Sequence, residues 1–201
     1  MPITLNGNGT VTGITVGGLP DGIVDTDMLA ANAVNLAKLG ATTGKNGPFL
    51  QVKQTVKTDV FSQSVATGTD SSVITGLTVS ITASSATNKI LIIYQVTGDI
   101  HCNYLTITKD GSSLTNATGD ASGNIARCTG KGDYTAHGYY MNSLPLIFLD
   151  TAGDTNAHTY GVKVRHASLS TQDVFINRRV NDNVATNATA ISTVTALEVA
   201  A

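Results

Sequence analysis

The chain contains little charge. Only 13% of its 201 residues are charged, and the formal net charge at pH 7 is −2, whereas soluble domains usually carry about 25% charged residues. A nucleic-acid-binding surface needs clustered basic side chains that displace counterions from the phosphates. The adjacent residues Arg178 and Arg179 would point to opposite faces of a strand, so they form no cluster. The sequence therefore predicts no nucleic-acid partner.

Long apolar runs are also missing. The longest are residues 90–94 and 144–149, well short of the roughly 20 residues that a membrane-spanning helix requires. The first residues, 1–4, lack the basic start and apolar centre of a secretory signal peptide. We therefore expect no membrane partner, and synthesis in a cytoplasm.

Cysteine is nearly absent. Cys102 and Cys128 are separated in the sequence, and no Cys-x-x-Cys motif is present. Two widely spaced cysteines in a cytosolic product are more often buried thiols than a disulfide. Thiols are therefore expected, and a disulfide between the two is the less favoured alternative.

Motifs for catalysis and cofactor binding are lacking. Segment 40–46 has three residues between its glycines, and Asn46 stands where a phosphate-binding loop has Ser or Thr. Glu198 is the single glutamate, so a catalytic carboxylate pair would have to come mostly from aspartates in turns. The histidines, none in a metal-ligand spacing, are His101, His137, His158 and His166. The sequence therefore predicts no enzyme activity and no cofactor. The alternative left open is a metal ion on a three-fold axis, bound by one histidine from each of three chains, because such a site leaves no motif in a single sequence.

The chain does contain the material of β-strands. Thr and Val are plentiful, and β-branched side chains suit a pleated, half-buried surface. From residue 49 onward, alternating apolar segments are separated by turn signals such as Asp110-Gly111. The expected strands are residues 49–56, 60–67, 73–83, 89–97, 104–109, 139–149, 159–167, 174–179 and 191–199. This pattern predicts an all-β fold, an antiparallel jelly-roll-like β-sandwich over residues 48–201. We expect 89–97 and the last strand to be central, and Pro145 to mark an edge or bulge.

The first 47 residues have a different texture. Residues 10–34 are rich in small residues and contain no Lys, Arg or aromatic side chain. They are still too apolar for a solvated linker, so their side chains should be buried against another molecule. We predict that residues 1–47 form an extended arm that attaches the chain to an assembly. Its candidate attachment residues are Val11, Ile14, Val16, Leu19, Ile23, Val24, Met28, Leu29, Val34 and Leu36.

One short helix is expected within this arm, at residues 26–39. Asp25 or Thr26 can cap its N-terminus, Lys38 lies in its last turn and Gly40 follows. A helix of this length is marginal in isolation. It should therefore form only when the arm is docked.

The second half of the chain holds one candidate ligand-binding cluster. Tyr134, Tyr139 and Tyr140 lie close to His137 in a Gly-containing stretch. Tyrosines on loops contact sugars and proteins well, because each combines a large apolar ring with a polar tip. The alternative is that Tyr139 or Tyr140 belongs to the core.

Three stretches carry a resemblance to a known class of proteins. They are GTVTGITVGGLPDGIVDTDMLAANAV at residues 9–34, PFLQVKQTV at 48–56 and SSATNKILIIYQV at 84–96. In these stretches the chain resembles small structural proteins of tailed bacteriophage virions, namely fibre, tailspike and capsid-decorating proteins. The resemblance covers the arm and the first half of the sandwich, while the second half shares only a general strand texture.

The resemblance implies a homotrimer at the virion surface, assembled in the host cytoplasm, whose arm binds the major capsid protein or another virion protein. Three arms could bury one another's apolar side chains around a three-fold axis. A tail fibre usually has a long repetitive shaft, and no such repeat occurs in this sequence, which favours a capsid-decorating (cement) protein or short head fibre. The alternative is a short tail fibre or receptor-binding tip, with a host surface polysaccharide as its further partner.

Overall fold

The computed structural model describes residues 48–100, 102–132, 141–167, 170–180 and 188–201, together with two short strands near the N-terminus. The chain divides into two compact units, residues 1–46 and 47–201. In the first unit, β1 (Thr4–Leu5) pairs antiparallel with β2 (Val11–Thr12), which sets Leu5 opposite Val11. The expected helix at 26–39 and the other candidate attachment residues, Ile14 to Leu36, lie outside the described residues.

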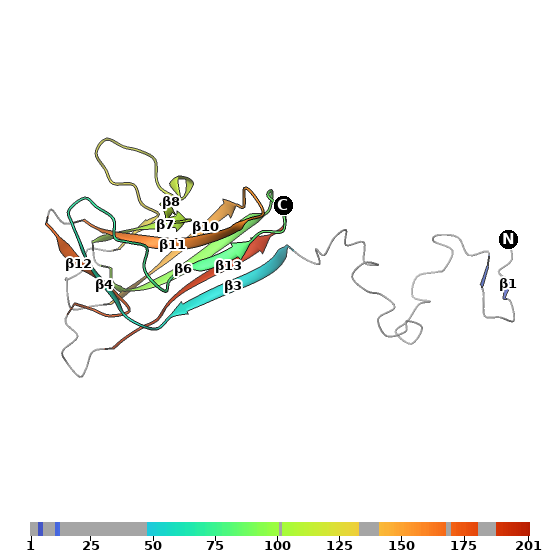
Figure 1. Ribbon diagram of the computed structural model, residues 1–201, viewed down its shortest axis with the longest axis horizontal. Coiled ribbons are helices and arrows are strands. Elements are labelled where there is room, and N and C mark those ends of the chain that lie inside the picture. Colours follow the sequence, from blue (N-terminus) through green and yellow to red (C-terminus); the bar gives the residue numbers. More distant parts are fainter. Residues whose placement is uncertain are drawn as a thin grey trace. The chain divides into compact units, whose positions relative to one another are not determined.

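The second unit, hereafter the jelly-roll unit, consists of two antiparallel sheets packed face to face (Figure 1). The first, called the β6 sheet, contains β3 (Phe49–Lys57), β4 (Phe61–Val65), β6 (Lys89–Asp99), β10 (Asn142–Thr151), β12 (Gln172–Ile176) and β13 (Ser192–Val199). The second, called the β11 sheet, contains β5 (Val79–Thr82), β7 (Asn103–Lys109), β8 (Ser112–Ser113), β9 (Gly130–Lys131) and β11 (Ala157–His166). A short 3-10 turn, η3, spans Thr115–Ala117. The predicted all-β sandwich is confirmed.

The order of the strands is that of a jelly roll. In the β6 sheet, β3, β13 and β6 are neighbours and β10 pairs with the other side of β6; in the β11 sheet the order is β5, β11, β7, β8. The chain therefore crosses from one sheet to the other between β4 and β5, β5 and β6, β6 and β7, β9 and β10, β10 and β11, and β11 and β12. The last strand, β13, lies between β3 and β6, and β6 lies between β13 and β10. Both expected central positions are confirmed.

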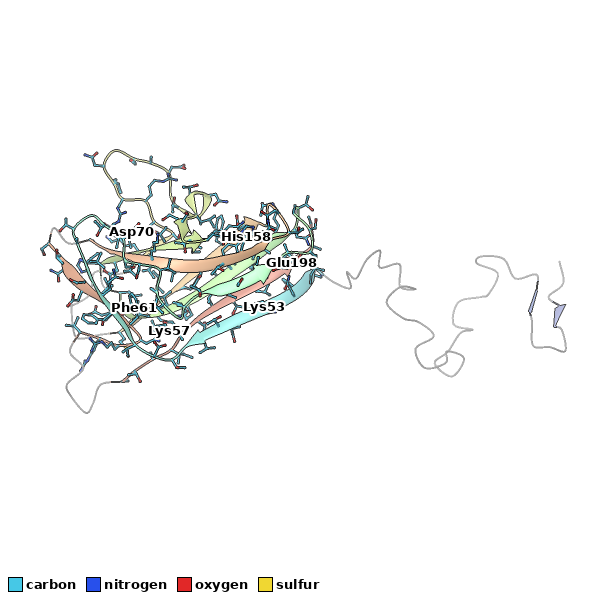
Figure 2. All side chains as sticks on the ribbon, viewed as in Figure 1. Lys53, Lys57, Phe61, Asp70, His158 and Glu198 are labelled. Atoms are coloured by element: carbon cyan, nitrogen blue, oxygen red, sulfur yellow. The ribbon has the colours of Figure 1, made fainter. Side chains whose placement is uncertain are left out.

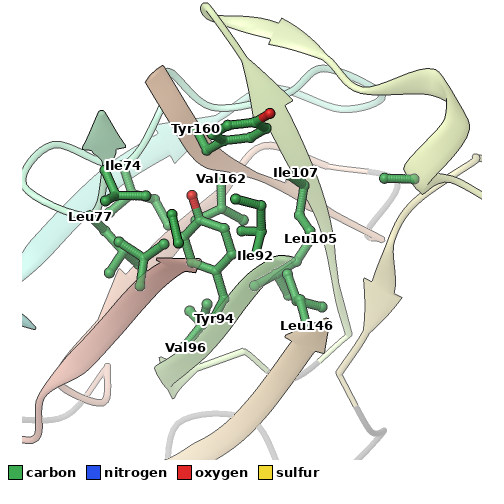
Figure 3. Packing of buried hydrophobic residues seen from close by; sticks show 14 of the residues in the cluster. Ile74, Leu77, Ile92, Tyr94, Val96, Leu105, Ile107, Leu146, Tyr160 and Val162 are labelled. Carbon is green, nitrogen blue, oxygen red and sulfur yellow. The ribbon is translucent and has the colours of Figure 1, made fainter. Parts of the chain in front are cut away.

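The core fills the space between the two sheets (Figure 3). Alternate residues of β6 point inward, and Ile92, Tyr94 and Val96 are completely buried. Val162 of β11 and Ile107 of β7 meet them from the opposite sheet and are also completely buried. Each such aliphatic side chain contributes about 1.5–3 kcal/mol when it leaves water, so these inward rows are a main source of the attraction between the two sheets.

One expected strand is shorter than predicted. Residues 73–83 alternate like a single strand, but the strand β5 spans only Val79–Thr82. Gly76, with φ of 78°, makes a turn that interrupts the alternation, because a positive φ is open to glycine and does not continue a strand. Ile74 and Leu77, on either side of this turn, are still completely buried. The apolar pattern therefore predicted their burial correctly, but its prediction of one continuous strand over residues 73–83 was wrong.

Pro145 lies in an edge strand of the β6 sheet. It belongs to β10, whose described pairing is with β6 alone, so β10 is an edge strand. Proline has no N–H to donate and is tolerated at sheet edges. The expectation of an edge position is confirmed.

Candidate interaction surface

The outer face of the β6 sheet carries one row of aliphatic side chains that crosses four neighbouring strands, flanked by rows that mix apolar and polar residues. Inward and outward residues alternate along β10, β6 and β13, so the outward residues form regular rows across the sheet. We call this surface the outer-sheet face. It consists of Ser143, Pro145, Ile147, Leu149 and Thr151 of β10, Lys89, Leu91, Ile93, Gln95 and Thr97 of β6, Thr193, Thr195, Leu197 and Val199 of β13, and Phe49, Val52, Gln54 and Val56 of β3.

The pairing register places its largest aliphatic side chains next to one another. Leu149 pairs with Leu91, Leu91 with Leu197, and Leu197 with Val52, which makes an unbroken apolar row across four strands. In the next row, Ile147 pairs with Ile93. Directly paired residues on one face have Cβ atoms about 4.5–5.5 Å apart, so these side chains form one continuous surface.

This surface is open to solvent in the single chain. Ile147 is 64% exposed, Val52 58% and Leu149 51%. Lys89 is the one charged residue among the described positions of the outer-sheet face. The largest exposed apolar patch of a protein often marks an interaction site, and the outer-sheet face is therefore a candidate interaction surface.

The opposite side of the sandwich has different chemistry. On β11, the buried residues Val162 and Val164 alternate with the half-buried Lys163 and Arg165, which point away from the core. Arg165 Nε lies 2.7 Å from a carboxylate oxygen of Asp70, and Lys163 donates to a backbone carbonyl. The β11 sheet thus shows the usual alternation of apolar-in and polar-out, whereas β10, β6, β13 and β3 of the β6 sheet also carry large aliphatic side chains on their outer side.

The sequence contains a pattern that indicates this second apolar face. Residues 90–94 and 144–149 are continuous apolar runs rather than alternations. Continuous runs are typical of strands that are covered on both faces. The apolar run within residues 89–97 predicted the central position of β6, but not that the second face of β6 and β10 is left uncovered.

The candidate ligand-binding cluster cannot be placed. Tyr134, His137, Tyr139 and Tyr140 lie outside the described residues, as does His101. The structure therefore does not show whether these side chains come together, and their role stays a prediction.

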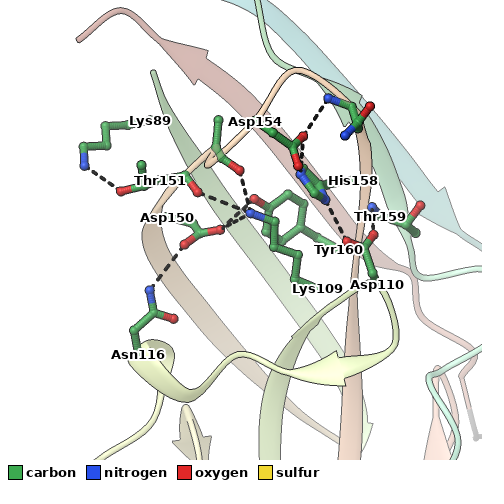
Figure 4. Close-up of polar contacts among 12 residues, drawn as sticks. Lys89, Lys109, Asp110, Asn116, Asp150, Thr151, Asp154, His158, Thr159 and Tyr160 are labelled. Atoms are coloured by element: carbon green, nitrogen blue, oxygen red, sulfur yellow. Dashed lines mark hydrogen bonds and ion pairs between the residues drawn. The ribbon is translucent and has the colours of Figure 1, made fainter. Parts of the chain in front are cut away.

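Inside the sandwich, Asp150 joins the two sheets (Figure 4). It lies on β10 and accepts hydrogen bonds from Tyr160 Oη of β11 at 2.8 Å and from Lys109 Nζ of β7 at 3.0 Å. Asn116, in η3, donates to its other oxygen at 3.3 Å. Burial, and then the neighbouring Asp150 carboxylate, raise the pKa of Tyr160 far above its ordinary value. The hydroxyl of Tyr160 therefore stays protonated and donates its hydrogen bond to Asp150. The cluster acts as a structural link between the two sheets.

A second buried carboxylate lies near the end of β13 (Figure 2). Glu198 is 1% exposed and accepts hydrogen bonds from Gln51 Nε2 at 2.6 Å, from the backbone N–H and hydroxyl of Ser84 at 2.7 Å, and from Asn88 Nδ2. Burial alone would raise the pKa of Glu198, but these hydrogen bonds outweigh it, and the pKa lies below its ordinary value. With its two oxygens accepting hydrogen bonds from Gln51, Ser84 and Asn88, Glu198 anchors the loop before β6 to β13 and β3.

His158 is held between two carboxylates (Figure 4). Its Nδ1 lies 2.7 Å from Asp110 and its Nε2 lies 3.0 Å from Asp154. The backbone N–H of Thr159 is the main cause of the lowered pKa of Asp110, and that of Asn156 plays the same part for Asp154. The sequence predicts His158 only as one of four histidines outside any metal-ligand spacing, because its contact with Asp110 arises only when β11 pairs with β7.

Within the described ranges, no group of three or more His, Cys, Asp or Glu side chains could hold a metal ion. Cys102 and Cys128 are both thiols, as expected. Nor does the described part of the chain contain a helix long and apolar enough to cross a membrane.

Comparison with known proteins gives no family. No protein-family model matches the chain, and no curated protein matches it in sequence. Among solved structures, a chain from "Structure of infectious bursal disease virus Gx strain" is similar at 14% sequence identity with a TM-score of 0.34. The matched region covers 75% of this chain and 37% of that chain.

Proposed function

We propose that this chain is a non-catalytic structural protein of a bacteriophage virion. In this proposal it is a homotrimeric capsid-decorating (cement) protein or short head fibre, which docks by residues 1–47 and projects the jelly-roll unit from the particle. The observation that carries the proposal is the outer-sheet face, an apolar and nearly uncharged surface that one chain leaves exposed. Such a surface is typical of a subunit that is completed by other chains.

The polar clusters of the jelly-roll unit support a structural role. Asp150 and Glu198 are each held by several internal donors and lie beneath the surface. A general acid or base needs a hydrogen-bonding position free for its substrate. These carboxylates instead tie strands and loops together, which suits a protein whose work is mechanical.

Decoration of the capsid fits the organisation of the chain better than a fibre does. The division between the two units falls at residues 46 and 47, so the segment that carries the candidate attachment residues leads directly into the jelly-roll unit without a repetitive shaft. A protein that binds several neighbouring capsid subunits stabilises the assembled state by mass action. The alternative is a short tail fibre or receptor-binding tip, whose polysaccharide-binding residues would be Tyr134, His137, Tyr139 and Tyr140.

Immunogold electron microscopy tests this proposal. Virions that carry the chain are labelled with an antibody raised against residues 48–201. Gold distributed over the capsid is the expected result. Gold confined to the tail would replace decoration by the fibre or receptor-binding alternative. Virions of confirmed protein content that take no gold, while the isolated chain is recognised, would overturn a position on the virion surface.

A further inference from the structure

We infer that copies of this chain associate with one another through the outer-sheet face. The inference rests on the proposed homotrimer and deepens it, because it names the surface that the subunits share. The residue types, the internal hydrogen bonds and the extent of this face each favour a second copy of the same chain as its occupant.

Charge is the first argument. Lys89 is the single charged side chain among the described positions of the outer-sheet face, and it lies in a terminal row, where its Nζ donates to Thr151 Oγ1 at 2.7 Å. A partner of opposite charge has nothing to recognise here. A second copy brings the same uncharged surface, so no like charges meet at the centre of the contact.

Several polar side chains of the face are already hydrogen-bonded to one another within the chain. Gln54 Nε2 donates to Thr195 Oγ1 at 3.0 Å. Gln95 and Thr97 both hydrogen-bond to the hydroxyl of Ser143. Burying an unpaired polar group costs free energy, whereas burying a paired one costs much less. The face can therefore be covered by an apolar partner without leaving these polar atoms unsatisfied.

The extent of the face suits a subunit interface. Four strands about 4.8 Å apart and about 30 Å long give the face a flat footprint of about 580 Å², which is of the same order as the roughly 800 Å² of accessible surface that each partner buries in a specific interface. Pairwise face-to-face packing of two such sheets would close a two-fold dimer, so in the proposed homotrimer the three faces surround the three-fold axis and each contacts both of its neighbours. The exposed Ile147, Leu149 and Val52 are the side chains that such packing would bury.

Other occupants fit less well. Sugars are bound by aromatic rings together with side chains that hydrogen-bond to hydroxyl groups, and Phe49 is the one aromatic residue among the described positions of this face. An anionic lipid surface attracts several basic side chains, and the face offers only Lys89. A second copy is therefore the occupant to which the inference commits.

The first test is the mass of the full-length chain in solution, measured by light scattering after size exclusion. We expect the parent chain to run at three times the 20.7 kDa of one copy. The variant Ile147→Lys/Leu149→Lys should run as single copies. The control Ile125→Lys, at an exposed position in the loop before β9, should stay trimeric.

Two results would overturn the inference. If the parent chain is a single copy at micromolar concentration, both the homotrimer and the shared face are wrong. If the Ile147→Lys/Leu149→Lys variant keeps its far-ultraviolet circular dichroism and remains trimeric, the homotrimer stands but is assembled elsewhere. Immunogold labelling is independent of both results, so the failure of the inference and the failure of the proposed function are distinguishable.

A second measurement covers the case in which the charged variant does not fold. The chain has no tryptophan, so Ile147→Trp introduces a single reporter, and Ile125→Trp is its matched control. We expect Ile147→Trp to emit at shorter wavelength than Ile125→Trp, and to shift toward longer wavelength on dilution as the copies separate. Equal, concentration-independent emission from the two variants would overturn the inference.

Discussion

At the scale of single residues, two buried tyrosines have opposite surroundings. Tyr160 donates its hydroxyl to Asp150 at 2.8 Å, whereas the buried hydroxyl of Tyr94 has no hydrogen-bond partner among the described residues. A buried polar atom without a partner costs stability, and one with a partner contributes it. Two substitutions that each remove one oxygen should therefore have opposite effects.

We expect Tyr160→Phe to lower the free energy of unfolding by about 1–2 kcal/mol, and Tyr94→Phe to leave it unchanged or raise it by up to about 1 kcal/mol. Urea denaturation followed by circular dichroism measures both. Each variant is the control for the other, because both positions are completely buried. A similar loss in both variants would show that the Tyr94 hydroxyl also stabilises the fold.

Glu198 gives a prediction that depends on pH. Because the folded-state pKa is lowered below the ordinary 4.5, the carboxylate stabilises the fold above that value, and this contribution is lost as pH falls through the folded-state pKa. Glu198→Gln should lower the free energy of unfolding by about 1.5–3 kcal/mol at pH 7, since it replaces an acceptor of charged hydrogen bonds.

The difference between the parent chain and Glu198→Gln should shrink as the pH falls below 4.5. Thermal or urea unfolding at several pH values between 2 and 7 measures it, and Asp120→Asn, at an exposed position, is the control. A difference that stays constant across this range would mean that the hydrogen bonds to Glu198 do not lower its pKa.

At the scale of elements, the junction between β6 and β12 depends on one glycine. β12 pairs with β6 only through Phe175 opposite Asp99 and Ile176 opposite Gly98 in the described register. A Cβ atom on Gly98 would overlap the carbonyl oxygen of Phe175 and would lie 2.8 Å from the Cα of Ile176. Backbone atoms cannot turn aside as a side chain can, so the two strands would have to separate.

We expect Gly98→Ala to lower the free energy of unfolding by about 1–3 kcal/mol, as overpacked sites do. It should also speed hydrogen exchange of the β12 amides. Gly119→Ala is the matched control, because nothing lies within 4 Å of a Cβ placed there, and its effect should stay within about 0.5 kcal/mol. Equal stability of the two variants would show that β12 tolerates displacement from β6.

At the scale of the whole molecule, attachment and folding should be separable. The jelly-roll unit has its own core, and the division of the chain falls before it, between residues 46 and 47. Deletion of residues 1–40 should therefore abolish binding to the particle while the remaining chain keeps its cooperative thermal unfolding.

Co-sedimentation of the truncated and full-length chains with particles that lack the protein measures this binding. The circular dichroism of the truncated chain is the control for its fold. Full binding by a truncated chain would contradict the assignment of attachment to residues 1–47 and would move it to the jelly-roll unit.

Much of the sandwich followed from local patterns. The strands at 49–56, 89–97, 104–109 and 191–199 were predicted to within a few residues of β3, β6, β7 and β13, because alternation with period two is a property of neighbouring residues. The strand at 73–83 was overextended, because alternation does not show where the φ of Gly76 becomes positive.

The sequence by itself determined the sandwich, the low charge and the continuous apolar run of β6, because composition and periodicity are read from residues adjacent in the chain. It could not determine that Leu149, Leu91, Leu197 and Val52 form one row, since they come from four strands and become neighbours only when those strands pair. The same holds for Asp150 with Tyr160 and Lys109, and for Glu198 with Gln51 and Ser84. Contacts between distant segments are fixed by register and by the packing of the sheets, and so the tertiary structure alone separated the covered face of β6 from the exposed one.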